Sequence, residues 1–478
     1  MADESTSSGR ELLVTLDRAA RQPLRAQLEH RLRDAIRSGQ LPAASQLPST
    51  RTLACDLGVT RGLVVEAYAQ LQAEGYLAAR PGSGTVVAVG AAANRAAGLR
   101  SPLQPVPALR WDFRPGVPDL RSFPRGDWTA ALRRALQSAP DSALGYGDPR
   151  GMPELRQALA GYLGRVRGTL ADPEQIVICA GFAQARNLLA RVLRERGAHR
   201  IGLEDPGQPE SMLSVQRARL EAVPIPVDQD GLRTDAVRRA GPDAVLVTPA
   251  HQFPTGAVLA PDRRRALLDW AREQGATVIE DDYDAEFRYD RDPVGALQGL
   301  APDHVIYAGS ASKSLAPGLR IGWLCCPLDL AGQVTEAKRA EDLGAPILDQ
   351  LALADLMNSG RFDRHLRRCR ARYRSRRDAL AAALAQHAPH VNLAGISAGL
   401  HAVAVLPDGA DEQAITGQAR RRSVGLYPIS TYRISPQDQP PALVFGYGGC
   451  SERAISTGIA QIADLLACDP APLPTPWS

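Results

Sequence analysis

The chain has 478 residues, of which 44% are hydrophobic and 23% charged, and its formal net charge is +4. These values predict a globular protein of two or three domains and exclude a mainly disordered chain. No apolar run is long enough to span a bilayer, and the polar N-terminus lacks the order of a signal peptide, so we expect a cytoplasmic protein without membrane contact. The seven cysteines are scattered without metal-ligand spacing, which predicts reduced thiols and no metal site.

The first segment, residues 12–89, has the pattern of three helices followed by a hairpin. Apolar residues recur at four-residue steps from Leu24 to Ile36, which predicts a helix that ends near Gly39. LPSTRTLACDLG predicts a second, short helix, and TRGLVVEAYAQLQAEGY predicts a third that Thr60 can cap. A Gly-rich turn in YLAARPGSGTVVAV separates two short β-prone runs. This order predicts a winged helix-turn-helix.

A helix-turn-helix reads DNA by placing its later helix in the major groove, while neighbouring groups bind phosphates. The candidate DNA contacts lie at the start of the third helix, in the preceding helix and in the hairpin: Arg51, Thr60, Arg61, Arg80, Gly82 and Ser83. Small three-helix units also occur in proteins that do not bind DNA. The string LPSTRTLACDLGVTR and the wing GSGTVV, however, resemble the DNA-binding domain of the GntR family of bacterial transcription regulators. The resemblance implies a double-stranded DNA operator as partner.

Two breaks divide the chain. Residues 90–110 are rich in Ala, Gly and Pro, which predicts a linker, and the proline-rich residues 468–478 predict a flexible tail. Between them, apolar runs such as QIVIC, AVLVTP, ATVIEDD and HVIYAG alternate with helical stretches such as PDRRRALLDWAREQ. This alternation predicts an α/β domain over residues 111–467, with a mostly parallel sheet and functional side chains at the carboxyl ends of strands.

The chain contains only two lysines, Lys313 and Lys338, among 56 basic residues. A desolvated lysine can lose its proton and condense with an aldehyde, whereas arginine stays protonated. An isolated lysine is most often a solvated surface charge. Lys313, however, lies in SASKSLAPGLRIG, where Ser310, Ser312 and Arg320 offer hydroxyls and a guanidinium suited to a phosphate. These neighbours favour Schiff-base chemistry at Lys313.

An acidic cluster follows the predicted strand in ATVIEDDYD. Asp281 could hold a pyridinium nitrogen protonated, and Tyr283 could reach the 3-oxygen of the same ring. A metal site or a solvated turn is the alternative interpretation of such a cluster. The apolar strand before it, with Lys313 beyond the next strand, favours the cofactor.

This region resembles the fold-type I pyridoxal-phosphate enzymes of the aspartate aminotransferase superfamily, over about residues 111–467. The resemblance implies pyridoxal 5'-phosphate as cofactor, with a large α/β domain and a small C-terminal α/β subdomain from about residue 364. It assigns Lys313 as the catalytic, aldimine-forming lysine, Asp281 as the partner of the pyridine nitrogen and Tyr283 as the partner of the 3-oxygen. It also matches phosphate-binding positions to Ser310, Arg320, Gly181 and Phe182 of ICAGFAQA, and to Tyr146 of YGDPRGMPELR. In the family this tyrosine reaches the phosphate of the partner subunit, which implies a homodimer with shared sites.

Three positions depart from the aminotransferase pattern. Phe253 in HQFPTG stands where an asparagine usually binds the 3-oxygen of the cofactor, and Gln208 stands where a tyrosine is frequent. Val444 stands where an arginine grips the substrate carboxylate, and Arg433 is the candidate substitute. The sequence therefore favours cofactor binding over amino-acid turnover.

A GntR-type winged helix, a linker and an aminotransferase-like domain form the layout of the MocR subfamily of regulators, which the chain resembles end to end. The resemblance implies a bacterial regulator whose aminotransferase-like domain is a sensor, with at most residual half-transamination. The implied effector is pyridoxal phosphate itself, in vitamin B6 metabolism, or an amine such as GABA or taurine that exchanges into a Lys313 aldimine. The absence of the carboxylate arginine favours the cofactor. The alternative is an active aminotransferase with a DNA-binding appendage.

Overall fold

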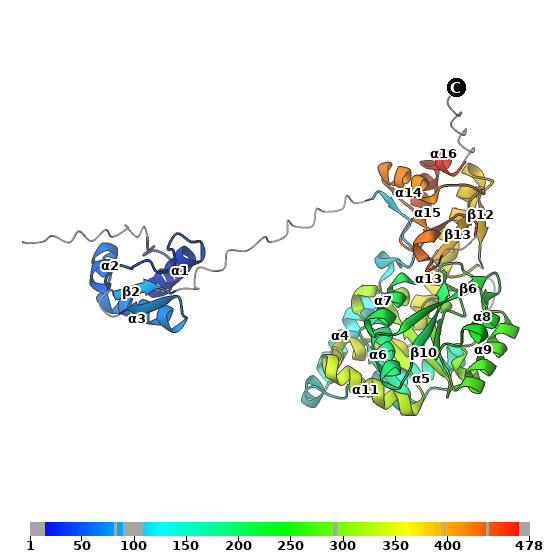
Figure 1. Ribbon diagram of the computed structural model, residues 1–478, viewed down its shortest axis with the longest axis horizontal. Helices are drawn as coiled ribbons and strands as arrows, with labels where there is room; N and C mark the ends of the chain where they lie inside the picture. The colour runs from blue at the N-terminus through cyan, green and yellow to red at the C-terminus, as the bar shows by residue number, and fades with distance from the viewer. Residues whose placement is uncertain are drawn as a thin grey trace, which may run out of the picture. The chain divides into compact units, whose positions relative to one another are not determined.

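The computed structural model describes residues 15–80, 84–88, 109–289, 294–395, 397–435 and 439–467. The chain divides into two compact units, Met1–Pro107 and Ala108–Ser478, and each is described by itself (Figure 1). Most of the predicted linker (residues 90–108) and the whole predicted tail (468–478) lie outside the described residues.

The first unit contains three helices and a two-stranded antiparallel sheet: α1 (Leu24–Arg37), α2 (Thr50–Leu57), α3 (Arg61–Ala73), β1 (Leu77–Arg80) and β2 (Gly84–Val87). The hydroxyl of Ser49 accepts a hydrogen bond from the backbone N–H of Thr52 at 3.1 Å and so caps α2. The Thr60 hydroxyl caps α3 in the same way, through the N–H of Leu63 at 3.4 Å. The predicted winged helix-turn-helix is confirmed.

The apolar stripe of α1 forms the centre of this small unit. Leu28, Leu32 and Ile36 are buried against Val64 and Leu71 of α3, because residues four apart lie on one face of a helix. The wing closes the other side, since Leu77 and Val87 are paired across the hairpin and belong to the same core.

The second unit contains a large, mostly parallel sheet. Its strands lie in the order β4 (Ile176–Cys179), β11 (Gly322–Cys325), β10 (Val305–Ser310), β9 (Thr277–Asp282), β8 (Ala244–Val247), β5 (Arg200–Asp205), β6 (Glu221–Asp228) and β7 (Gly231–Leu232). The five strands from β10 to β6 are parallel to one another, whereas β11 and β7 are antiparallel to their neighbours. This sheet confirms the predicted fold class.

Helices cover both faces of the sheet (Figure 1). They are α4 (Arg125–Ser138), α5 (Pro153–Arg167), α6 (Phe182–Glu195), α7 (Pro209–Arg217), α8 (Thr234–Ala240), α9 (Pro261–Gln274), α10 (Ala311–Ser314), α11 (Leu328–Asp342) and α12 (Ile347–Asn358). Val278 packs in one core with α8 and α9, and the next residue, Ile279, packs in another with α6 and α11. Successive side chains of a strand face opposite sides, so a strand covered on both sides must be apolar throughout.

A smaller four-stranded sheet follows, in the order β12 (Asn392–Ala394), β13 (His401–Val405), β16 (Ala442–Gly446) and β15 (Tyr427–Pro428). The helices of this part are α13 (Arg361–His387), α14 (Glu412–Arg421), α15 (Glu452–Ala460) and α16 (Ala463–Leu466). The segment that opens the unit joins it, because β3 (Trp111–Asp112) pairs in parallel with β14 (Val424–Gly425). Short 3-10 helices complete the unit: η1 (Leu120–Ser122), η2 (Asp141–Leu144), η3 (Pro173–Gln175), η4 (Ala285–Phe287), η5 (Gln298–Leu300), η6 (Pro317–Leu319) and η7 (Ile429–Tyr432).

No helix in the part of the chain that the structure describes has both the length and the apolar character needed to cross a bilayer.

Candidate functional site

Two neighbouring strands place the predicted site residues at one edge of the large sheet. Strands β9 and β10 are parallel, and Gly309 is paired with Asp282, so both strands end at the same level. The acidic cluster follows β9, and Ser310 ends β10 and caps α10 by accepting a hydrogen bond from the N–H of Ser312 at 3.0 Å. The short helix carries Lys313. Segments about thirty residues apart are therefore brought together by strand register.

Lys313 is largely buried, and its Nζ donates a hydrogen bond to the carbonyl oxygen of Gly116 at 2.7 Å. Burial lowers the pKa of Lys313, while the carboxylates of Asp284 and Asp281 act in the opposite direction. A lowered pKa increases the fraction of neutral, nucleophilic amine. The other lysine, Lys338, lies within α11, where it is fully buried and forms an ion pair of 2.8 Å with Asp342 one turn further along the helix. This pair has a structural role within α11.

Asp281 is a buried carboxyl group beside Lys313. Burial raises its pKa to about 8, against the opposing charge of Arg186. Its Oδ2 lies 3.4 Å from the Nε2 of Gln208, which donates to it. A carboxyl group with such a pKa becomes a stable carboxylate when a cation binds beside it, as the nitrogen of a pyridinium ring would.

A candidate anion cradle lies at the start of α6, beside Gly181 and Arg320. Gly181 precedes the helix with φ +78°, and a Cβ at this position would lie 2.9 Å from the guanidinium nitrogens of Arg320. Arg320 donates to the carbonyl of Ala180, and a Cβ on Gly322 would lie 2.9 Å from the Cα of Gly181, so β11 brings this arginine against the helix N-terminus. A guanidinium and free helical N–H groups suit an anion.

Two further predicted residues lie at this edge. The hydroxyl of Ser310 donates to that of Ser312 at 2.8 Å, and its oxygen is also close to the carbonyl of Ile321, the residue after Arg320. Phe182 is the first residue of α6, and the guanidinium of Arg186 lies 5.6 Å from the centre of its ring. The cradle therefore offers hydrogen-bond donors and a cation at the same edge of the sheet as Lys313.

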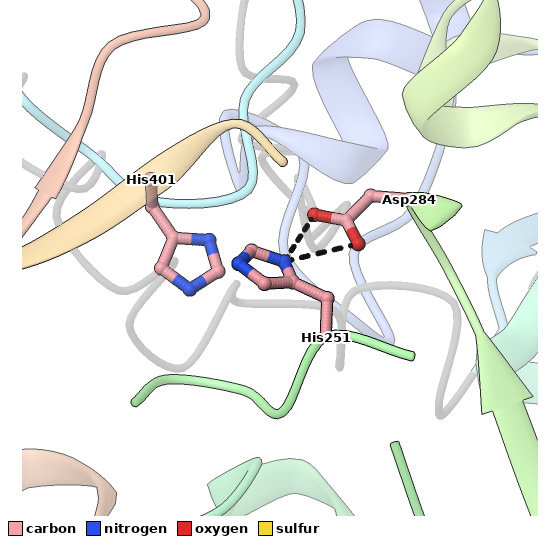
Figure 2. Close-up of side chains that lie close together, drawn as sticks. All are labelled: His251, Asp284 and His401. Atoms are coloured by element: carbon pink, nitrogen blue, oxygen red, sulfur yellow. Dashed lines mark hydrogen bonds and ion pairs between the residues drawn. The ribbon is translucent and has the colours of Figure 1, made fainter. Parts of the chain in front are cut away.

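The phenol of Tyr283 contacts His251, which forms a group of three buried side chains with Asp284 and His401 (Figure 2). The Tyr283 hydroxyl donates to the carbonyl of His251 at 2.9 Å, and the His251 Nδ1 lies 2.9 Å from a carboxylate oxygen of Asp284. The ring of His401 lies 4.9 Å from that of His251, and Phe253 meets the His401 ring edge-on at 5.2 Å. Burial and the neighbouring His251 hold the pKa of His401 well below its usual value.

His251, Asp284 and His401 offer ligand atoms that all lie within 4.8 Å of one another, which is close enough for a metal ion. His251 and Asp284 already bind each other, and His401 Nε2 bonds to the carbonyl of Pro254 at 3.1 Å, so an acid–histidine pair accounts for the geometry. No role was predicted for these residues from the sequence. His251 is the first residue of HQFPTG and Asp284 the last of EDDYD, but His401 comes from β13, and no spacing signal connects it to them.

Tyr146 lies in an exposed segment between η2 and α5, and its side chain is 83% exposed. Among the described residues, no hydrogen bond joins it to Lys313 or to the cradle. A large aromatic side chain in this position is available to another chain.

The predicted DNA contacts lie on the surface of the first unit. Arg51 is exposed on α2, Thr60 caps α3, Arg61 begins α3, and Arg80 ends β1. In the described part of the chain, none of these three arginines is paired with a carboxylate, so their charges remain available for phosphates or bases. Gly82 and Ser83, the remaining two predicted contacts, lie outside the described residues.

Comparison with known families identifies both units. Residues 24–87 match the model of the bacterial regulatory proteins of the gntR family, and residues 119–434 match that of the class I and II aminotransferases. The chain is therefore a DNA-binding regulator with an aminotransferase-like domain.

Similar regulators share this layout over nearly their full length. The chain is 34% identical to the probable rhizopine catabolism regulatory protein MocR of Rhizobium meliloti, over 94% of this chain and 95% of that protein. It is 35% identical to the pyridoxine biosynthesis transcriptional regulator PdxR of Corynebacterium glutamicum, over 92% and 95%. An archaeal alanine:glyoxylate aminotransferase superposes with a TM-score of 0.69 at 27% identity, over 76% of this chain and 91% of that one. The chain belongs to the MocR subfamily of GntR-type transcription regulators.

Proposed function

We propose that this transcription regulator binds pyridoxal phosphate at Lys313, in the bacterial cytoplasm, and that occupation of this site controls its affinity for an operator. The observation that carries the proposal is the meeting, at one edge of the sheet, of a buried lysine, a buried carboxyl group and an anion cradle. A charged group is costly to bury alone. Together the three groups match three parts of pyridoxal phosphate: the lysine matches the aldehyde, the carboxyl group matches the ring nitrogen, and the cradle matches the phosphate.

Bound there, pyridoxal phosphate would supply an aldehyde that condenses with amines and a ring that withdraws electrons. Lys313 presents its amine from α10, with a pKa that burial lowers. Asp281 would hold a proton at the ring nitrogen, and Tyr283, whose hydroxyl is oriented by the carbonyl of His251, would bind the 3-oxygen. Phe253 lines the same small pocket as Asp281, in place of a polar partner for that oxygen.

The cofactor itself is the effector that the site supports best. Val444 is buried in the middle of β16, paired with Val403, so the position of the usual carboxylate arginine offers no charge. An amino-acid effector would lack its anion partner there. A signal from vitamin B6 metabolism also fits PdxR, the relative that is named for pyridoxine biosynthesis. A GABA-like or taurine-like amine is the second candidate.

We also propose a homodimer with shared cofactor sites. The 83% exposed Tyr146 and the 63% exposed Leu144 form an apolar surface on the segment before α5. Scattered exposed apolar residues are common, but two large ones within three positions of a loop favour contact with a second chain.

The experiment is fluorescence anisotropy of the purified protein on its own upstream intergenic DNA at fixed salt, with and without pyridoxal phosphate. Salt is fixed because phosphate contacts make DNA affinity steeply salt-dependent. We expect the cofactor to change the affinity of the wild type but not of Lys313→Ala or Lys313→Arg, which retains the positive charge but cannot condense.

Three outcomes would contradict parts of the proposal. Borohydride trapping of the cofactor on Lys338 instead of Lys313 would show that the site is wrongly assigned. DNA binding that ignores the cofactor but responds to an amine would make the amine the effector. Robust steady-state transamination of common amino acids would favour the alternative of an active aminotransferase with a DNA-binding appendage.

A further inference from the structure

A second, larger cavity lies within the second unit, between the large sheet and the small one. Its volume is about 730 Å³, within the range of small-molecule sites. One wall is formed by the end of β6 and by residues 255–258, and the opposite wall by β13, η7 and β16. A molecule bound here would contact both parts of the unit at once.

The segment from His251 to Gly256 separates this cavity from the cofactor residues. Phe253 lines the small pocket of Asp281, whereas Thr255 and Gly256 line the large cavity. The partition is one loop thick, because a Cβ on Gly256 would lie 3.3 Å from the Nε2 of His251. On the other wall His401 packs against His251 (Figure 2). The strand then continues along the cavity, which is lined by its alternate residues 403 and 405.

The cavity is mainly apolar, with one cation that lacks an acidic partner among the described residues. Arg433 makes a hydrogen bond of 3.2 Å to the carbonyl of Pro440, and its buried Nε has no hydrogen-bond partner in the described part of the chain. On the facing wall, Asp228 is already bound to Arg263 through two contacts of 2.6 and 2.8 Å. Arg433 is half-buried, and a carboxylate in the cavity would bind its guanidinium, including the buried Nε, through a charge-assisted pair.

We propose that this cavity binds a small organic acid, whose carboxylate pairs with Arg433 and whose apolar body packs against Val403, Val405 and Ile429. The inference goes beyond the proposed function, because none of these groups belongs to the Lys313 site. Such a ligand would hold the two sheets at one separation, since it touches both. It would thus be a second input to a regulator whose first input is the cofactor.

The test is isothermal titration calorimetry of the full-length chain freed of cofactor, with 4-phenylbutyrate as the probe and its neutral amide as the matched control ligand. We expect saturable binding of the acid, weakened at least about tenfold in Arg433→Met because a charge-assisted pair is lost. The amide should bind the wild type and this variant equally. Arg453→Met, which removes an exposed arginine on α15, is the matched control protein and should bind like the wild type.

A second variant fills the cavity from the facing strand: Val405→Phe should also abolish binding without touching the arginine. Lys313→Ala should bind the acid normally. Failure of the cofactor proposal would therefore not affect the organic-acid proposal, and failure of the organic-acid proposal would not affect the cofactor proposal. The proposal is overturned if acid and amide bind the wild type equally, if Arg433→Met binds the acid as well as the wild type does, or if pyridoxal phosphate displaces the acid competitively. It is also overturned if 4-phenylbutyrate, hexanoate and indole-3-acetate all fail to saturate at about 10 mM, a concentration that detects even weak sites.

Discussion

The buried carboxyl group of Asp281 should make the cofactor-free protein less stable as the pH rises. Burial raises its pKa to about 8, whereas an aspartate in the unfolded chain titrates near 4. Between these values the folded state holds a proton that the unfolded state has released. The stabilising effect of this proton is complete below pH 4 and is lost progressively up to pH 8.

The size of the effect follows from the two pKa values. Each pH unit inside the window costs about 1.4 kcal/mol, so the change from pH 5 to pH 8 amounts to roughly 3–4 kcal/mol from this group alone. Asp281→Asn removes the titration but keeps an oxygen that can accept the hydrogen bond from Gln208. Without cofactor, the variant should therefore be more stable than the wild type at pH 8, and the two should differ much less at pH 5.

The assay is the apparent melting temperature of both proteins, measured without cofactor across pH 5 to 8. Asp408→Asn, which changes an exposed aspartate in a turn, is the control and should follow the wild type at every pH. Added pyridoxal phosphate should reduce the pH dependence of the wild type, because the cationic ring nitrogen favours the carboxylate. An equal difference between wild type and Asp281→Asn at pH 5 and pH 8 would refute the reasoning.

Three other predictions test the cradle, the DNA-binding surface and the core of the first unit. Gly181→Ala should weaken cofactor binding at least about tenfold in a spectrophotometric titration, because its Cβ would lie 2.9 Å from Arg320. The control is Gly197→Ala, which also has a positive φ but no atom within 4 Å of the added Cβ, and it should leave cofactor binding unchanged. Arg61→Ala should weaken specific DNA binding by about 1–3 kcal/mol in anisotropy, and no loss at any operator would remove it from the contacts. Leu32→Ala should destabilise the first unit by about 2–5 kcal/mol, visible as faster hydrogen exchange there, because the side chain is fully buried.

The winged helix could be predicted well because its signals are local. Helix caps, a four-residue apolar period and a Gly-rich hairpin each lie within about twenty residues, and the structure caps the third helix with the expected Thr60. The strands that precede Asp281 and Lys313 were predictable for a similar reason. Both are apolar runs followed by polar residues, and parallel strands end at one edge.

The small sheet and the residues it contributes could not be predicted in this way. The position of His401 depends on how β13 packs against the loop after β8, and that contact joins segments about 150 residues apart. Arg433 illustrates the same limit: the sequence offered it as a substitute carboxylate clamp, and the structure places it on the wall of the large cavity. Contacts between separately packed parts depend on side-chain shape over a whole surface, for which a single sequence has no short-range signal.

The acid–histidine pair bears on how a cofactor could act as a signal rather than a catalyst. A ligand changes an equilibrium between two arrangements only by the difference in its affinity for them, and a tenfold change in DNA affinity needs about 1.4 kcal/mol. His251 is bonded to Tyr283, lies against Gly256 on the wall of the large cavity, and packs against His401 of the small sheet. A change in the hydrogen bond of Tyr283 therefore acts on a residue that is in contact with both parts of the unit. The catalytic site of an aminotransferase needs a group that binds the substrate carboxylate, whereas a sensor needs a contact between the large and the small sheet. The chain has a buried valine at position 444, and it has the buried pair of His251 and His401 between the two sheets.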